Sequence, residues 1–111
     1  MTTDSLKDIG FAPVATATNN NMSGGFCGDL LSWAMANAKE GDVWFTVMGN
    51  MNAVAVASLA DVAAIVICQG VKLPKEVITK AIEEKIDIYA TELPVYEAAV
   101  KYDRAFFSER Q

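Results

Sequence analysis

The turn Gly49-Asn50-Met51-Asn52 is the segment of this 111-residue chain whose residue types best suit ligand binding. It separates two apolar runs and is expected to join a strand to a helix. Glycine lets a ligand approach the backbone closely, and the free amides at a helix start attract anions. Gly49, Asn50 and Asn52 are therefore predicted to contact a phosphate or another anion. The alternative is an ordinary turn in which Asn50 caps the helix, and the lack of lysine and arginine in the turn favours it.

Three other polar segments are expected near this turn: 23–29, Gln69-Gly70 and Thr91-Glu92. In an open parallel sheet, ligands bind beyond the carboxyl ends of the strands. Gly28, Asp29, Gly70 and Thr91 are therefore also predicted to bind a ligand. The first segment suits a mobile flap over a ligand, or a flexible loop in which Asp29 caps the next helix. It is not a P-loop, because the GxxxxGK[ST] spacing is absent.

Several kinds of catalytic and metal site are excluded by composition. The chain has no histidine, which removes the commonest general base, the commonest zinc ligand and any histidine-based nucleophilic triad. The acidic residues follow no repeating ligand spacing and are predicted to cap helices or face solvent; the candidates considered are Asp29, Asp42, Asp61, Glu92 and Glu97. No metal site and no cofactor is predicted.

The cysteines and the chain start point to a cytoplasmic protein. Cys27 and Cys68 lack a second pair that would complete a zinc site, and we expect both to be reduced, buried thiols. The first residues contain neither a basic patch nor an apolar core, so no signal peptide is expected. The apolar window 53–68 is shorter than the roughly 20 residues of a membrane span and contains Asp61, so no membrane association is expected.

Charge and hydrophobicity limit the class of protein further. Fourteen acidic against nine basic residues give a net charge of -5, which argues against a nucleic-acid partner. The hydrophobic fraction of 52% is enough to build a core, and the length suits one domain.

The apolar periodicity predicts alternating strands and helices. Strands are expected at 12–17, 43–48, 63–68 and 86–91, with a short extended piece at 26–27. Helices are expected before Gly10, at 30–38 and 51–60, and after Pro74 and Pro94. This order predicts a small single α/β domain with a mostly parallel sheet of about four to five strands flanked by helices. Residues 1–22 are expected to form an N-terminal helix/strand segment of the same domain as 23–111.

The predicted helix at 51–60 is apolar nearly all round. A helix without a polar face is buried on more than one side, which in so small a domain favours burial by a partner subunit. Met51, Val54, Val56 and Leu59 are therefore predicted to lie at a homodimer interface.

From Gly24 to Tyr102 the sequence resembles the DRTGG domain family. The similar segments are Gly28-Asp29-Leu30-Leu31-Ser32, the residues 35–46, the run 63–67 with Gln69-Gly70 and the Pro74 helix, and Thr91-Glu92. The family's Asp-Arg-Thr falls on Asn50-Met51-Asn52 and its Gly-Gly on Gln69-Gly70, so only Gly49 and Gly70 match.

This resemblance implies a domain similar to the N-terminal domain of HPr kinase/phosphorylase. Family members also lie within phosphotransacetylases and beside CBS domains in pyrophosphatases, where they regulate or dimerise, and stand-alone members look like companions of iron-only hydrogenase systems. We therefore expect a non-catalytic regulatory or assembly domain that acts as a homodimer, with a protein partner in a metabolic or hydrogenase-associated system. The alternative is a sensor of a nucleotide or anion at the carboxyl edge of the sheet. An enzyme would need a carboxylate or thiol to act without histidine.

Overall fold

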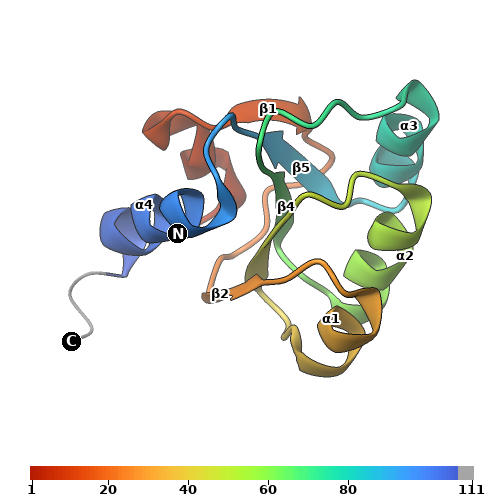
Figure 1. The fold of residues 1–111 in the computed structure, drawn as a ribbon, viewed down its shortest axis with the longest axis horizontal. Coiled ribbons are helices and arrows are strands. Elements are labelled where there is room, and N and C mark those ends of the chain that lie inside the picture. Colours follow the sequence, from red (N-terminus) through yellow and green to blue (C-terminus); the bar gives the residue numbers. More distant parts are fainter. Residues whose placement is uncertain (108–111) are drawn as a thin grey trace.

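A computed structural model describes residues 1–107 and shows one five-stranded sheet (Figure 1). The strands are β1 (Ala12–Ala15), β2 (Gly24–Cys27), β3 (Asp42–Thr46), β4 (Ala64–Ile67) and β5 (Asp87–Ala90). Their order across the sheet is β1-β5-β4-β3-β2. Strands β2 to β5 run parallel, and β1 pairs antiparallel with β5 at one edge. The prediction of a small, mostly parallel α/β domain is confirmed.

Helices cover both faces of the sheet. Helices α1 (Leu31–Asn37), α2 (Met51–Ala60) and α3 (Lys75–Glu83) form a layer on one face, and α4 (Val95–Phe106) lies on the other with the 3₁₀ helix η1 (Thr3–Ile9) (Figure 1). Helices α1, α2 and α3 each connect one parallel strand to the next. Such crossover connections are needed because a short turn cannot join parallel strands.

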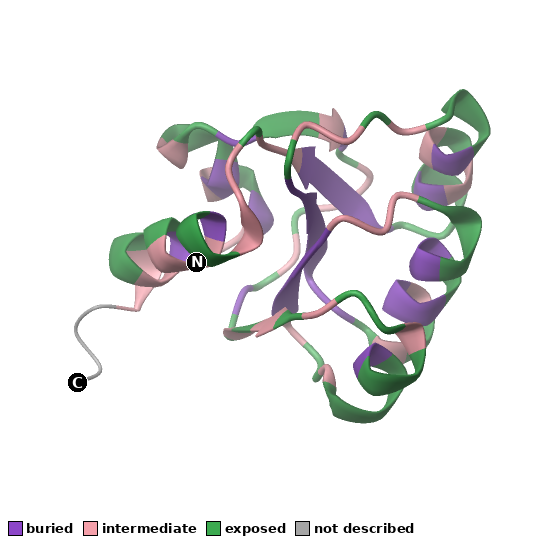
Figure 2. Cartoon of the chain, viewed as in Figure 1, coloured by how far each residue is buried: buried purple, intermediate pink, exposed green. Residues whose placement is uncertain are grey.

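The two central strands are buried on both faces. Side chains of β3 and β4 alternate between a core under α1–α3, which contains Trp44 and Ile65, and a core under α4 and η1, which contains Phe45 and Val66. Figure 2 shows the central strands buried and the outer sides of the helices exposed. This arrangement explains why both strands are continuous apolar runs in the sequence.

Most predicted helix ends are confirmed. The Asn50 side chain accepts a hydrogen bond from the Ala53 amide at 2.9 Å and caps α2, and Asp61 ends that helix with a φ of 59°. Helices α3 and α4 begin directly after Pro74 and Pro94. The first helix ends at Gly10, whose φ of 95° suits glycine.

Two predictions about single residues are wrong. Leu30, and not Asp29, occupies the N-cap of α1, without a side-chain cap, because the Asp29 carboxylate bonds to another loop. Cys27 is exposed, since β2 lies at an edge of the sheet, whereas Cys68 is buried as expected. In the described part of the chain no helix is long and apolar enough to cross a membrane.

The N-terminal segment is tied to strand β5 of the sheet by a buried carboxylate. Asp87 accepts hydrogen bonds from Thr3 Oγ1 at 2.6 Å and from the Thr18 amide at 2.9 Å. Leu6 and Phe11 of the same segment belong to the core under α4. Residues 1–22 therefore pack directly on the sheet.

Candidate functional site

The carboxyl ends of β2 and β3 are held together by the predicted ligand residues themselves. Asp29 Oδ1 accepts hydrogen bonds from Thr46 Oγ1 at 2.7 Å and from the Val47 amide at 2.9 Å. The Gly28 carbonyl accepts one from Trp44 Nε1 at 2.9 Å. These bonds fix the loop after β2 against β3 and its end, so they give Gly28 and Asp29 a structural role whether or not a ligand binds there.

Gly49 permits a close approach, but the approaching group belongs to this chain. A Cβ at Gly49 would lie 2.4 Å from Leu73 Cδ2 and 3.5 Å from Val71 Cγ1. The loop after β4 therefore packs on the turn. Asn50 caps α2, and Asn52 is exposed on the first turn of that helix.

Gly70 and Thr91 are brought together at the carboxyl ends of β4 and β5. The Gly70 amide donates to the Thr91 carbonyl at 3.0 Å, which joins the two loops. Both residues line a cavity of about 680 Å³, which we call the edge cleft. A cavity of this size lies within the range of about 300–1,000 Å³ typical of small-molecule sites.

The edge cleft combines apolar walls with a few charged groups. Its walls come mainly from Val14, Val71, Leu73, Ile78 and Leu93, all partly buried. Its charged residues, each exposed, are Lys72, Glu92 and Lys101. Mostly apolar linings with few polar groups are typical of ligand pockets.

Two glycines border the charged groups of the cleft, and at Gly70 the lack of a side chain makes room for the neighbouring carboxylate. A Cβ at Gly70, whose φ is 68°, would lie 2.6 Å from Glu92 Oε1. A Cβ at Gly10 would lie 3.4 Å from Lys101 Nζ. The carboxylate and the ammonium therefore lie at the bare backbone of two different turns, and within residues 1–107 neither Glu92 nor Lys101 forms an ion pair.

Sequence reasoning identified part of the edge cleft and missed the rest. Gly70 and Thr91 follow from the rule for carboxyl edges, and Lys72 lies close enough to Gly70 to have been included. No pattern near Gly10 or Lys101 in the sequence predicts that they line the cleft. They reach this edge because β1 pairs antiparallel with β5 and because α4 packs nearby.

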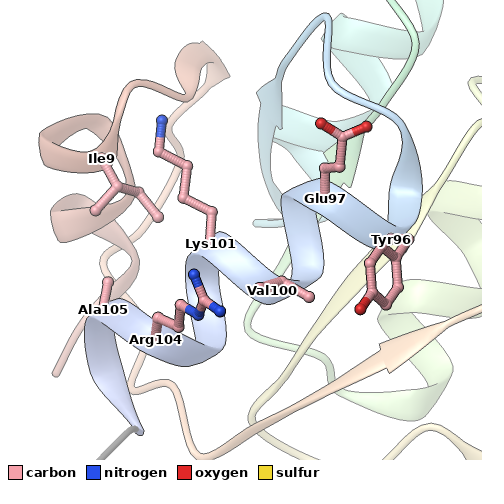
Figure 3. Close-up of a pocket in the computed structure, with 7 residues that line it drawn as sticks. All are labelled: Ile9, Tyr96, Glu97, Val100, Lys101, Arg104 and Ala105. Carbon is pink, nitrogen blue, oxygen red and sulfur yellow. The ribbon is translucent and has the colours of Figure 1, made fainter.

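A second cavity lies on the outer side of α4 and has a volume of about 480 Å³ (Figure 3). Figure 3 shows Tyr96 and Lys101 extending to different sides of the helix, with Lys101 directed toward Ile9. Glu97 and Arg104 add charges of opposite sign. One helix supplies nearly all of this lining, so the cavity is a hollow in the helix surface.

The predicted interface residues fall into two groups. Val54 and Val56 are 1% and 7% exposed, so one chain already buries them, whereas Met51 and Leu59 are 42% and 72% exposed. Neighbouring α1 leaves Trp33 64% exposed. The exposed apolar residues that follow helical spacing on the two helices define what we call the charge-free face: Leu30, Trp33, Met51, Ala55 and Leu59.

Neither thiol has the lowered pKa of an activated nucleophile. Desolvation and then the negative charge of Asp29 raise the pKa of the Cys27 thiol. Burial, followed by smaller effects of Cys27 and Asp29, raises the pKa of Cys68 to about 11. A thiol reacts as the thiolate, so neither is activated. No group of three or more cysteine or acidic side chains in residues 1–107 is arranged to hold a metal ion.

The sequence matches no protein-family model and no curated protein. Its fold is similar to the solved structure of the CBS and DRTGG domains from the regulatory region of Clostridium perfringens pyrophosphatase, complexed with the activator diadenosine tetraphosphate. The TM-score is 0.69 at 14% sequence identity, over 88% of this chain and 44% of the other. The chain thus spans less than half of that region. The comparison supports a DRTGG-related fold, and the similarity to HPr kinase/phosphorylase stays a prediction.

Proposed function

We propose that this chain is a non-catalytic regulatory or assembly domain that acts as a homodimer through its charge-free face. The observation that carries the proposal is the exposed side of α1 and α2, which presents large apolar side chains and no charged residue. Single exposed apolar residues are ordinary, but several large ones on two helices that pack together are typical of an interaction site.

A second copy of the chain is the occupant that the charge distribution favours. Each chain has a net charge of -5, so two copies repel one another over most of their surface. A twofold interface brings identical surfaces together, so charged residues within it would face like charges. The charge-free face avoids that repulsion. Helix α3 of the same layer differs, since it carries lysine and glutamate on its exposed side.

The side-chain chemistry supports a non-catalytic role. The chain has no histidine, both thiols have raised pKa values, and Asp29 is engaged by Thr46 and Val47. The pyrophosphatase region of similar fold is regulatory, which supports regulation as the role of this domain. A cytoplasmic location and a metabolic or hydrogenase-associated protein partner remain predictions of the sequence.

Ligand sensing is the second candidate function. The edge cleft supports it, because it joins apolar walls to two lysines and a glutamate at the carboxyl edge of the sheet. The pyrophosphatase region was solved with a nucleotide activator, which makes nucleotides the natural class to test here.

Tryptophan quenching tests the dimer. The chain has two tryptophans; Trp44 is fully buried within one chain, whereas Trp33 lies on the charge-free face. Raising the protein concentration is expected to protect Trp33 from acrylamide as the dimer forms. Leu59→Glu places a charge on the face and abolishes the protection. Tyr96→Glu is the matched control, because Tyr96 is exposed on α4 across the sheet.

Quenching that does not change with concentration would contradict the dimer. Equal behaviour of Leu59→Glu and Tyr96→Glu would show that copies associate through some other surface.

A further inference from the structure

We propose that the edge cleft is a nucleotide site in which Lys72 and Lys101 bind the phosphate and Glu92 accepts N–H groups of the base. This inference rests on the proposed ligand-sensing function and adds the residues and the ligand class. The cleft is large enough for such a ligand, at about 680 Å³, and three chain segments far apart in sequence build it.

The charge inside the cleft is opposite to that of the chain. Two lysines and one glutamate line it, giving a local charge of +1, while the whole chain carries -5. Of the other lysines in residues 1–107, Lys7 pairs with Asp4 and Lys80 with Glu84, whereas Lys39, Lys75 and Lys85 form no ion pair. Within residues 1–107, Lys72 and Lys101 form no ion pair, so their ammonium groups are available to an anion.

The carboxylate of Glu92 gives the site a second, different end. It lies against Gly70, whereas the Lys101 ammonium lies against Gly10. The two groups share the cleft without pairing to each other. A ligand that spans them needs an anionic group at one end and hydrogen-bond donors at the other.

The remaining walls of the cleft are largely apolar. Val71 and Leu73 come from the loop after β4, and Val14 and Ile78 come from β1 and α3. A flat ring buries its faces against such side chains while its edge donates to the carboxylate. A phosphate, a ring and N–H donors in one molecule describe a nucleoside phosphate.

Calorimetric titration of the whole chain with three probes tests the site. AMP carries all three features, ribose 5-phosphate lacks the base, and adenosine lacks the phosphate. AMP is expected to bind most tightly. Lys72→Gln combined with Lys101→Gln is expected to weaken AMP and ribose 5-phosphate roughly tenfold or more. Lys39→Gln is the control, because this exposed lysine follows α1 at the opposite edge of the sheet.

Glu92→Ala separates the two ends of the site. It is expected to weaken AMP and adenosine and to leave ribose 5-phosphate unchanged or bound more tightly, since a negative charge is removed. The proposal is overturned if none of the probes binds, if Lys39→Gln has the effect of the double variant, or if Glu92→Ala leaves AMP unchanged. If the chain dimerises but binds none of the probes, only the nucleotide site is contradicted. If the chain binds AMP as a monomer, only the homodimer is contradicted.

Discussion

Replacing Asp87 by alanine is expected to detach the N-terminal segment from the sheet. The carboxylate is fully buried and accepts hydrogen bonds from Thr3 Oγ1 at 2.6 Å and the Thr18 amide at 2.9 Å. A hydrogen bond to a charged group contributes about 1.5–3 kcal/mol, so losing both, offset by the relief of a buried charge, costs about 3–5 kcal/mol. That is a large part of a typical stability of about 5–15 kcal/mol.

Thermal unfolding followed by circular dichroism measures this loss. At about 4 °C per kcal/mol for a domain of this size, Asp87→Ala is expected to lower Tm by about 12–20 °C. Asp87→Asn is the control: it keeps one acceptor, and its amide can donate to the Thr3 hydroxyl, so the loss is smaller. Thr3→Val combined with Asp87→Ala should cost less than the sum of the single changes. A Tm drop of less than about 4 °C for Asp87→Ala would refute the reasoning.

Two further changes test packing and pH dependence. Gly49→Ala forces the new methyl group onto Leu73 Cδ2 and is expected to lower the free energy of unfolding in urea by about 1–3 kcal/mol. Adding Leu73→Ala is expected to restore part of that stability. An unchanged free energy of unfolding in Gly49→Ala would mean that the loop does not pack on the turn. Burial raises the pKa of Cys68 to about 11 from 9.0, so the folded state holds this proton more tightly than the unfolded chain. The resulting stability is complete below pH 9 and is lost as the pH rises toward 11; Cys68→Ala is expected to flatten that decline, and an unchanged slope would contradict the assignment.

The sequence predicted the central strands and most helix ends because their signals are local. Strands β3 and β4 are continuous apolar runs, and Asn50 is a strong capping residue. Strand β2 was only partly recognised, since Gly24 and Gly25 weaken its pattern and it pairs with β3 alone. Its edge position also explains why Cys27 is exposed.

The candidate site was predictable only where it depends on strand order. Gly70 and Thr91 were found because parallel strands end at one edge. Gly49 was predicted to let a ligand approach the backbone, and a sequence does not reveal that Leu73 of the same chain lies there. Lys101 was missed because its position depends on how α4 lies beside η1, which is a long-range property of the fold.

The apolar residues of α2 divide into a buried group and an exposed group. Val54 and Val56 fill the core, so they have almost no surface left to offer a partner. Met51 and Leu59 remain exposed on α2, which packs beside α1. The periodicity alone does not divide the two groups, because every side of the helix is apolar.

Sedimentation equilibrium of the unmodified chain tests the central claim most directly. The charge-free face predicts a mass that rises with concentration to twice the 11.9 kDa of one chain. Adding salt should leave this dimer intact or strengthen it, because the face contains no charges to screen and the like charges elsewhere repel. A mass of 11.9 kDa at every concentration would contradict the account.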